Sequence, residues 1–192
     1  VCSSDLATEE AIEPVLARLP GVSIAVHVAP EIHLLGGPVS SLETLIEELA
    51  SRGLFARLLP FPPLHTPGCD YLNDTVIRSV ESAWASANEP RIPVYSSSGG
   101  APSPRDRSDV PAMVSRLLNE PVRFWQAIRR MHDDGVRVFV EAGDAGLEST
   151  IGAAIPSHGA IVASIGDENV HPLTQLHRFC GRLFAAGVTI DL

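Results

Sequence analysis

The sequence predicts an α/β protein, and two observations lead to that prediction. Over residues 7–61, apolar spacing follows the order helix, strand, strand, helix, strand. After Asp70, helical and extended segments alternate again, which favours a parallel sheet covered by helices. The 192 residues, of which 45% are hydrophobic and 19% charged, are enough to bury a sizeable core.

The first predicted helix begins after Thr8, whose hydroxyl can cap it, and ends at Pro20-Gly21. Its apolar residues recur at helical spacing: Ile12, Val15, Leu16 and Leu19. Two strands follow. In the first, alternate residues face inward: Val22, Ile24, Val26 and Val28. The second is short and runs through Ile32 and Leu34.

A second helix begins at Ser40, which with Glu43 forms a predicted capping box, and Gly53 follows its end. Its apolar stripe consists of Leu42, Leu45, Ile46 and Leu49. Residues 54–61 form another predicted strand. Together these elements predict a split βαββαβ unit that lacks its first strand.

The first six residues, VCSSDL, match the translation of one frame of a common sequencing-library adapter. A secretory signal would instead begin with basic residues followed by an apolar run. We expect residues 1–6 to be an adapter-derived tail on a gene fragment cut inside its reading frame, which also accounts for the missing strand. The alternative interpretation is a natural polar N-terminal tail.

The second region has predicted helices and strands that alternate. We expect a helix over residues 71–86, a strand over 92–96 and an exposed loop over 97–109. Asn119-Glu120-Pro121 opens a further helix that ends at Gly135. A strand through Val136, Val138 and Val140, a short helix, a strand over 161–165 and a last helix before Gly187 complete the order.

Composition excludes several classes of function. With 14 basic and 23 acidic residues the net charge is −9, which disfavours binding to nucleic acid or to an anionic membrane. No apolar run is long enough to span a bilayer. The three cysteines lack the spacing of a disulfide framework or a zinc site, so we expect a cytoplasmic protein that binds no metal.

His65 is the most informative single residue. It lies in the segment FPPLHTP, between a predicted strand and a predicted helix, where prolines on both sides restrict the backbone. An imidazole held in this way suits general acid–base catalysis, although a histidine in a surface turn is the alternative. Cys69 suits a small buried residue better than a nucleophile. The sequence contains no G-x-S-x-G elbow, P-loop or G-x-G-x-x-G fingerprint.

Several segments resemble the acyltransferase domain of type I polyketide and fatty acid synthases, the malonyl-CoA:acyl-carrier-protein transacylase family. Residues 22–35 and 40–61 are similar to its small subdomain, and LHTP at 64–67 is similar to its F-H-[ST]-P turn. NEPVRF at 119–124 is similar to its REPVRF segment, and VFVEAG at 138–143 to its VFVEVGP strand. Residues 173–192 resemble the helix and AGVPVDL strand that follow the domain.

This resemblance implies a ferredoxin-like small subdomain over residues 7–62, without its first strand. It also implies the C-terminal part of an α/β-hydrolase-like large subdomain over 63–170, followed by a helix and strand over 171–192. Members of the family transfer an acyl group in two steps, from coenzyme A to a serine and then to acyl carrier protein. The motif match assigns His65 as the general base for that serine. The serine and a carboxylate-binding arginine belong to a segment upstream of Ala7, so we expect the 192 residues alone to be inactive.

The resemblance implies a coenzyme A thioester as substrate and no bound cofactor. The implied partners are acyl carrier protein and neighbouring synthase domains. Relatives carry HAFH for malonyl or YASH for methylmalonyl selection where this chain has PPLH, so Pro63 and Leu64 are candidate substrate-binding residues, and the bulk of Leu64 favours malonyl.

Two other departures affect the expected chemistry. Leu117 stands where relatives often have Asn or Gln supporting the histidine, which is harmless only if the support comes from the backbone. Asp144 stands where the family often has Pro. Two alternatives therefore stay open: a non-catalytic docking or structural domain of a large synthase, and an unrelated ferredoxin-like sensor of small molecules.

Overall fold

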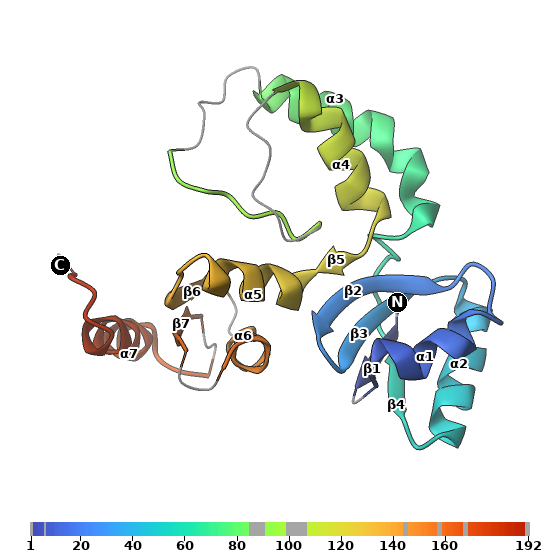
Figure 1. Cartoon of the computed structure of the whole chain (residues 1–192), viewed down its shortest axis with the longest axis horizontal. Helices are drawn as coiled ribbons and strands as arrows, with labels where there is room; N and C mark the ends of the chain where they lie inside the picture. The colour runs from blue at the N-terminus through green and yellow to red at the C-terminus, as the bar shows by residue number, and fades with distance from the viewer. Residues whose placement is uncertain are drawn as a thin grey trace. The chain divides into compact units, whose positions relative to one another are not determined.

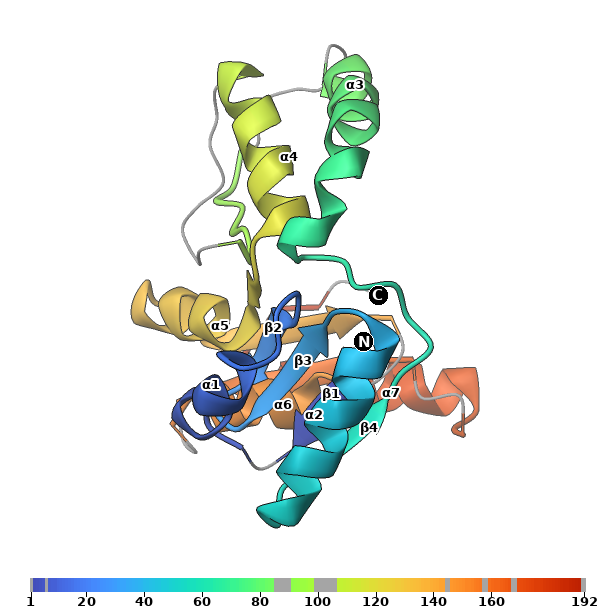
Figure 2. The same ribbon diagram turned by 90° about the vertical axis from the view of Figure 1, so that its right-hand side faces the viewer.

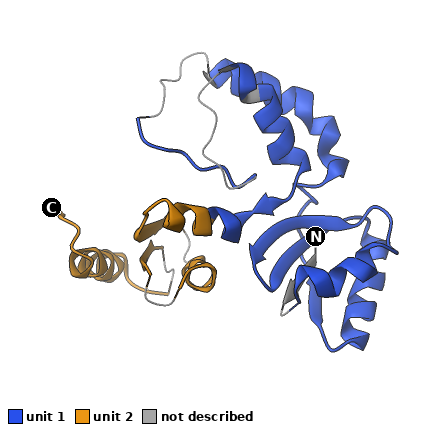
Figure 3. Ribbon diagram, in the orientation of Figure 1, with its two compact units in different colours: residues 1–127 blue, residues 128–192 orange. Residues whose placement is uncertain are grey.

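The computed structural model describes residues 2–5, 7–84, 91–98, 107–143, 146–156, 159–166 and 169–190 (Figure 1). The chain divides into two compact units, Val1–Ala127 and Ile128–Leu192 (Figure 3). This division falls at neither of the boundaries expected at 62/63 and 170/171, which stay predictions. No helix within the described residues is long and apolar enough to cross a membrane.

The first unit contains a five-stranded sheet in the order β4-β1-β3-β2-β5. Its elements are β1 (Cys2–Asp5), α1 (Glu9–Leu16), β2 (Ser23–Ala29), β3 (Ile32–Gly36), α2 (Val39–Ser51), β4 (Phe55–Leu58) and β5 (Val122–Arg123). β5 runs parallel to β2, and the other neighbouring strands are antiparallel. Strands β1 to β4 with α1 and α2 form the split βαββαβ unit that the sequence predicts.

The expectation that this unit lacks its first strand is wrong. Cys2–Asp5 forms β1, which lies between β3 and β4 and pairs with Leu35 to Ile32 on one side and Leu58 to Phe55 on the other. The segment has little β propensity, so its sequence does not reveal the strand. Backbone N–H and C=O groups can pair whatever the side chains are. Without β1, the facing edges of β3 and β4 would both be unpaired, and β1 supplies the partner for each.

The hydrophobic core lies between the sheet and the two helices α1 and α2, which cover one face of it (Figure 2). Its buried members lie on α1, α2 and the two central strands and include Ile12, Val15, Ile24, Leu35, Leu42, Leu45 and Leu49. Gly53, with φ +76°, ends α2 as predicted. Neither helix is capped as predicted, because Thr8 makes no capping hydrogen bond through its side chain and α2 begins at Val39, one residue before Ser40.

The two central strands bury a different set of residues from the one predicted. Register shifts in the pairing of β2 with β3 change the alternation, so that Ala25, His27 and Ala29 are buried in β2 while Val26 and Val28 are half-buried. In β3 the buried side chains include His33 and Leu35 rather than those of Ile32 and Leu34. The rings of His27 and His33 meet edge to face across the two strands, with centroids 5.2 Å apart.

A helical hairpin completes the first unit. A 3-10 segment, η1 (Pro67–Leu72), leads into α3 (Asn73–Trp84), which lies beside α4 (Val110–Asn119), as Figures 1 and 2 both show. α4 falls where no helix is predicted, although Val114 and Leu118 have helical spacing and Val114 is fully buried. The strand expected over 92–96 is a single bridge residue, Tyr95. Of the expected loop over 97–109, residues 99–106 lie outside the described residues.

The second unit begins inside α5 (Phe124–Asp133), which starts three residues later than Pro121 suggests because β5 intervenes. It contains β6 (Val138–Ala142), α6 (Glu148–Ala154), β7 (Ile161–Ile165) and α7 (Pro172–Ala185). β6 and β7 pair in parallel, as the alternation of helices and strands predicts. Residues 188–190 form no strand after α7, and Asp144 lies outside the described residues.

Polar side chains connect the elements of the second unit. Phe139 and Glu141, not Val138 and Val140, are the buried side chains of β6. Burial opposes ionisation of Glu141, but hydrogen bonds from the Ser164 hydroxyl (2.6 Å) and from the backbone of Leu147 and Gly146 lower its pKa.

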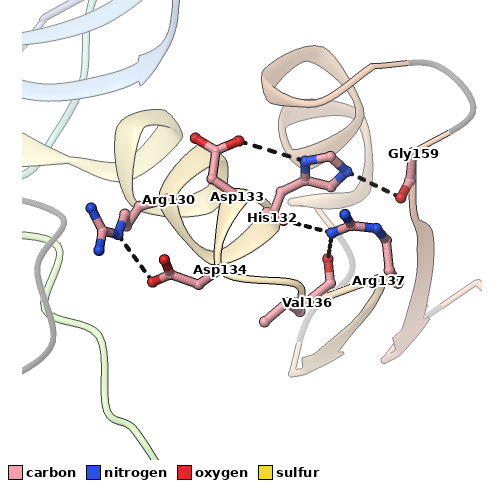
Figure 4. Close-up of polar contacts among 7 residues, drawn as sticks. All are labelled: Arg130, His132, Asp133, Asp134, Val136, Arg137 and Gly159. Atoms are coloured by element: carbon pink, nitrogen blue, oxygen red, sulfur yellow. Dashed lines mark hydrogen bonds and ion pairs between the residues drawn. The ribbon is translucent and has the colours of Figure 1, made fainter.

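Near the start of β7, His132 of α5 lies with Nε2 3.2 Å from the carbonyl oxygen of Gly159 (Figure 4). Arg137 donates to the His132 carbonyl, and Arg130 pairs with Asp134 one helical turn away. These contacts connect the end of α5 to the strand that follows it and to the loop before β7.

Candidate active site

The site begins with the backbone of the turn that carries His65. His65 has φ +65°, and among the described residues it is the single non-glycine residue in the left-handed region. A residue with a Cβ is uncommon in this conformation, which costs free energy and persists where the surrounding structure holds it. Prolines at 62, 63 and 67 restrict the chain on both sides, and the Leu64 N–H donates to the carbonyl oxygen of Pro62 (2.9 Å). The turn therefore holds the imidazole in a defined direction, as its sequence predicts.

The buried side of this turn rests on the end of strand β3. The hydroxyl of Thr66, a residue 5% exposed, donates to the carbonyl oxygen of Pro63 at 2.7 Å. A Cβ placed on Gly36 would lie 2.8 Å from the Thr66 methyl group and 3.0 Å from Cβ of Pro63. The turn can approach the sheet this closely because Gly36 has no side chain.

The imidazole of His65 is held by the neighbouring helix. Its Nδ1 lies 2.6 Å from the backbone carbonyl oxygen of Leu117, near the C-terminal end of α4. The carbonyl groups in the last turn of a helix have no intrahelical partner, so this oxygen is free to accept. The support of His65 therefore comes from the backbone, and the leucine side chain at position 117 does not remove it.

This hydrogen bond determines which ring nitrogen is free. A carbonyl oxygen only accepts, so Nδ1 carries the hydrogen, and in the neutral ring Nε2 keeps its lone pair. His65 is half-buried. It can therefore take a proton at Nε2 from a hydroxyl or thiol placed beside it and later return the proton.

Cys69 lies under the same turn and is buried, with an exposed fraction of 2%. Its Sγ donates to the carbonyl oxygen of Pro63 at 3.3 Å. This placement agrees with the interpretation of Cys69 as a small buried residue.

Of the two candidate substrate-binding residues, Pro63 lines a groove of about 600 Å³ together with residues at the start of β2 and just before α2, including Ser23 and Pro38. Leu64 is 37% exposed and does not line that groove. Their role in substrate binding stays a prediction.

Four other histidines among the described residues have surroundings that account for them structurally. His27 and His33 are buried in the sheet, His132 contacts Gly159, and His171 caps α7 by accepting from the Leu173 N–H (3.3 Å). Within the described residues, no three His, Cys, Asp or Glu side chains lie close enough together to hold a metal ion. His158 lies outside the described residues.

Comparison with known proteins finds synthases among the relatives of this chain. No family model matches the sequence. Erythronolide synthase EryA3 of Saccharopolyspora erythraea is 28% identical over 199 residues, a match that covers 100% of this chain and 6% of that protein. The 6-methylsalicylic acid synthase of Aspergillus terreus is 31% identical over 118 residues, covering 61% of this chain and 6% of that protein.

Solved structures agree with these relatives. The acyltransferase domain from the second module of the salinomycin polyketide synthase superposes with a TM-score of 0.84 at 23% identity, over 99% of this chain and 45% of that one. The chain has the fold of a polyketide synthase acyltransferase domain. The malonyl-CoA acyl carrier protein transacylase of Clostridium perfringens has the same fold, with a TM-score of 0.75 at 21% identity over 97% of this chain and 58% of that one.

The resemblance seen in the motifs is thus confirmed, in sequence and in fold, over nearly the whole chain. The chain spans about half the length of the solved acyltransferase domains and 6% of the length of the two synthases. The sequence analysis predicts no helix at α4, and therefore does not predict where the Leu117 carbonyl lies. Asp109 before Pro111, with Val114 and Leu118 following at helical spacing, is the signal that could have revealed α4.

Proposed function

We propose that this chain is part of an acyltransferase that moves a malonyl-type acyl group from coenzyme A to acyl carrier protein. The acyl group passes through a serine ester, and that serine lies outside the 192 residues. One observation supports this proposal most: the hydrogen bond from His65 Nδ1 to the Leu117 carbonyl (2.6 Å), which leaves Nε2 as a proton acceptor. The similarity to acyltransferase domains supplies the class of reaction.

In the proposed mechanism, His65 Nε2 takes the serine proton as the oxygen attacks the thioester carbonyl carbon. The carbon–sulfur bond then breaks, and the imidazolium returns the proton to the departing coenzyme A thiolate. The second half-reaction runs in the opposite sense, with the thiol of acyl carrier protein attacking the serine ester. The Leu117 carbonyl accepts from Nδ1 throughout and so keeps the ring in place.

The proposal extends to substrate and partners. Leu64, a large apolar residue where relatives have Phe or Ser, favours a malonyl unit. Acyl carrier protein and the neighbouring domains of a synthase are the proposed partners, in the cytoplasm, and the thioester substrate carries the reacting group without a separate cofactor.

A chimera tests the role of His65. This chain replaces the matching half of an active acyltransferase domain, and malonyl transfer to acyl carrier protein is measured with and without His65→Ala. We expect a loss of about 10²- to 10⁴-fold, the usual contribution of a general base. Gly181→Ala serves as the matched control, because a Cβ there meets no atom within 4 Å. Near-unchanged transfer by the His65→Ala chimera would remove this residue from the mechanism.

The alternative of a non-catalytic docking domain rested partly on Leu117. Because the backbone supplies the support, any residue at this position can provide it, and the leucine no longer favours that alternative. A chimera that folds and binds acyl carrier protein but transfers nothing, even with His65 intact, would favour the docking function instead.

A further inference from the structure

We propose that Asn119 and Asn73 are positioning residues that hold the Leu117 carbonyl against His65. This inference rests on the proposed function, because it concerns the support of the proposed general base. All the residues that this inference uses are described and belong to the first unit.

The two asparagines form a second connection between the segments that the His65 hydrogen bond joins. Asn119 Nδ2 donates to Asn73 Oδ1 at 2.9 Å, across 46 positions of sequence. The His65–Leu117 bond crosses 52 positions and joins the same two segments, residues 65–73 and 117–119. Asn73 begins α3 directly after η1, and Asn119 ends α4. The two hydrogen bonds therefore lie at opposite ends of η1.

The last turn of α4 needs such a connection. Its backbone closes with the Glu120 N–H donating to the Arg116 carbonyl (2.9 Å), after which the chain is extended at Glu120. Leu117 is 37% exposed, so apolar burial does little to hold this turn. Exposed helix ends open more readily than helix centres. Asn119 also donates to the Ser115 carbonyl at 2.9 Å, so its amide connects the last turn of α4 both to the preceding turn of the same helix and to α3.

The His65 turn, on the other side of this hydrogen bond, also depends on its surroundings to keep its conformation. His65 occupies the left-handed region, which a non-glycine residue leaves when the surrounding contacts weaken. If the end of α4 moves, the Nδ1 hydrogen bond is lost, and the turn loses a contact that keeps this conformation. The structure thus assigns the asparagine pair to maintaining the tautomer of His65 and not only to packing the hairpin.

The experiment uses the chain itself and measures the imidazole nitrogen resonances of His65 by ¹⁵N NMR. In the unmodified chain we expect the Nδ1–H tautomer. In Asn119→Ala and in Asn73→Ala we expect the Nε2–H population to rise about fivefold, the change that the loss of one hydrogen bond produces. Asn73→Asp keeps an acceptor for Asn119 and should retain the unmodified tautomer ratio. Ser79→Ala removes an exposed hydrogen bond to the Thr75 carbonyl in the same helix and is the matched control.

An unchanged His65 tautomer in a folded Asn119→Ala or Asn73→Ala chain would overturn the proposal. If the Nε2–H population rises as much in Asn73→Asp as in Asn73→Ala, the proposal is also overturned. Such a result would mean that both substitutions loosen the hairpin in general, whether or not an acceptor for Asn119 remains. If Asn119→Ala does not fold, the Asn73→Ala and Asn73→Asp comparison decides. These readouts need no acyl transfer, so they can fail while the His65→Ala chimera supports the proposed function, and the reverse can also occur.

Discussion

At the scale of single residues, the close approach of the His65 turn to the sheet depends on one glycine. Gly36 ends β3 directly beneath the His65 turn, where a Cβ would meet Thr66 and Pro63 at 2.8 and 3.0 Å. The Thr66 side chain cannot simply rotate away, because its hydroxyl donates to the Pro63 carbonyl. The distance between the sheet and the turn is therefore set by the absence of a side chain at position 36.

We expect Gly36→Ala to lower the free energy of unfolding by about 1–3 kcal/mol, the usual cost of overpacking. Urea denaturation followed by tryptophan fluorescence measures this in the first unit. Gly68→Ala is the control from the same turn, since a Cβ there lies 3.8 Å from Thr66 Oγ1, an ordinary contact. Equal stability of the two variants would show that the turn moves freely away from the sheet.

At the scale of elements, the unusual feature is the histidine pair in β2 and β3. His27 and His33 are 2% and 1% exposed. Burial lowers the pKa of His27; Glu9 of α1 raises it, and His33 and Arg123 of β5 lower it further. Burial also lowers the pKa of His33, although Glu9 and backbone groups of Ala7 and Pro30 favour its charged form. Both rings are therefore buried in the neutral form.

This pair makes the stability of the first unit depend on pH. In the unfolded chain each ring takes up a proton near its ordinary pKa of 6.5, whereas the folded chain takes it up only at lower pH. Stability should therefore be full above pH 6.5 and fall below it, by at most about 1.4 kcal/mol per pH unit for each histidine. Urea denaturation between about pH 8 and about pH 5 measures the slope.

Replacing both rings by leucine should flatten this pH dependence, because β2 and β3 then carry no buried imidazole that takes up a proton on unfolding. His177→Leu, at an exposed position of α7, should leave the slope unchanged. A slope that persists in the His27→Leu/His33→Leu chain would place the titrating groups elsewhere.

At the scale of the whole molecule, the proposed reaction needs two residues, a general base and a nucleophile, and the proposal assigns only the general base to this chain. The 192 residues contain no G-x-S-x-G elbow, and the match to the acyltransferase domain of the second salinomycin synthase module covers 45% of that domain. α7 buries none of its residues, and Phe184 on it is 78% exposed. The proposed reaction accordingly needs a serine nucleophile in addition to His65.

We therefore expect the purified chain to show no transfer from malonyl-CoA to acyl carrier protein, because a general base without its nucleophile forms no acyl-enzyme. Radiolabelled malonyl-CoA with acyl carrier protein measures this, and the chimera with an intact serine elbow is the positive control. Turnover by the chain alone, sensitive to His65→Ala, would show that the chain supplies its own nucleophile.

Much of the fold was predictable from spacing alone. The stripes of α1 and α2, the glycine ends at Gly53 and Gly187, and the parallel β6–β7 pair all follow from local periodicity. β1 and α4 were not predicted, for different reasons. β1 forms through backbone pairing that its side chains do not encode, and α4 lies next to a loop whose composition obscured its pattern.

The sequence by itself determined the α/β class, the order of most elements and the turn that presents His65, because each depends on residues close together in the chain. The tertiary structure alone decided which faces of β2, β3 and β6 are buried, since register shifts and strand neighbours are not local properties. It also decided how His65 is supported. A backbone carbonyl 52 positions away accepts from Nδ1, and every residue carries such a group, so no side-chain pattern could identify Leu117 as its source.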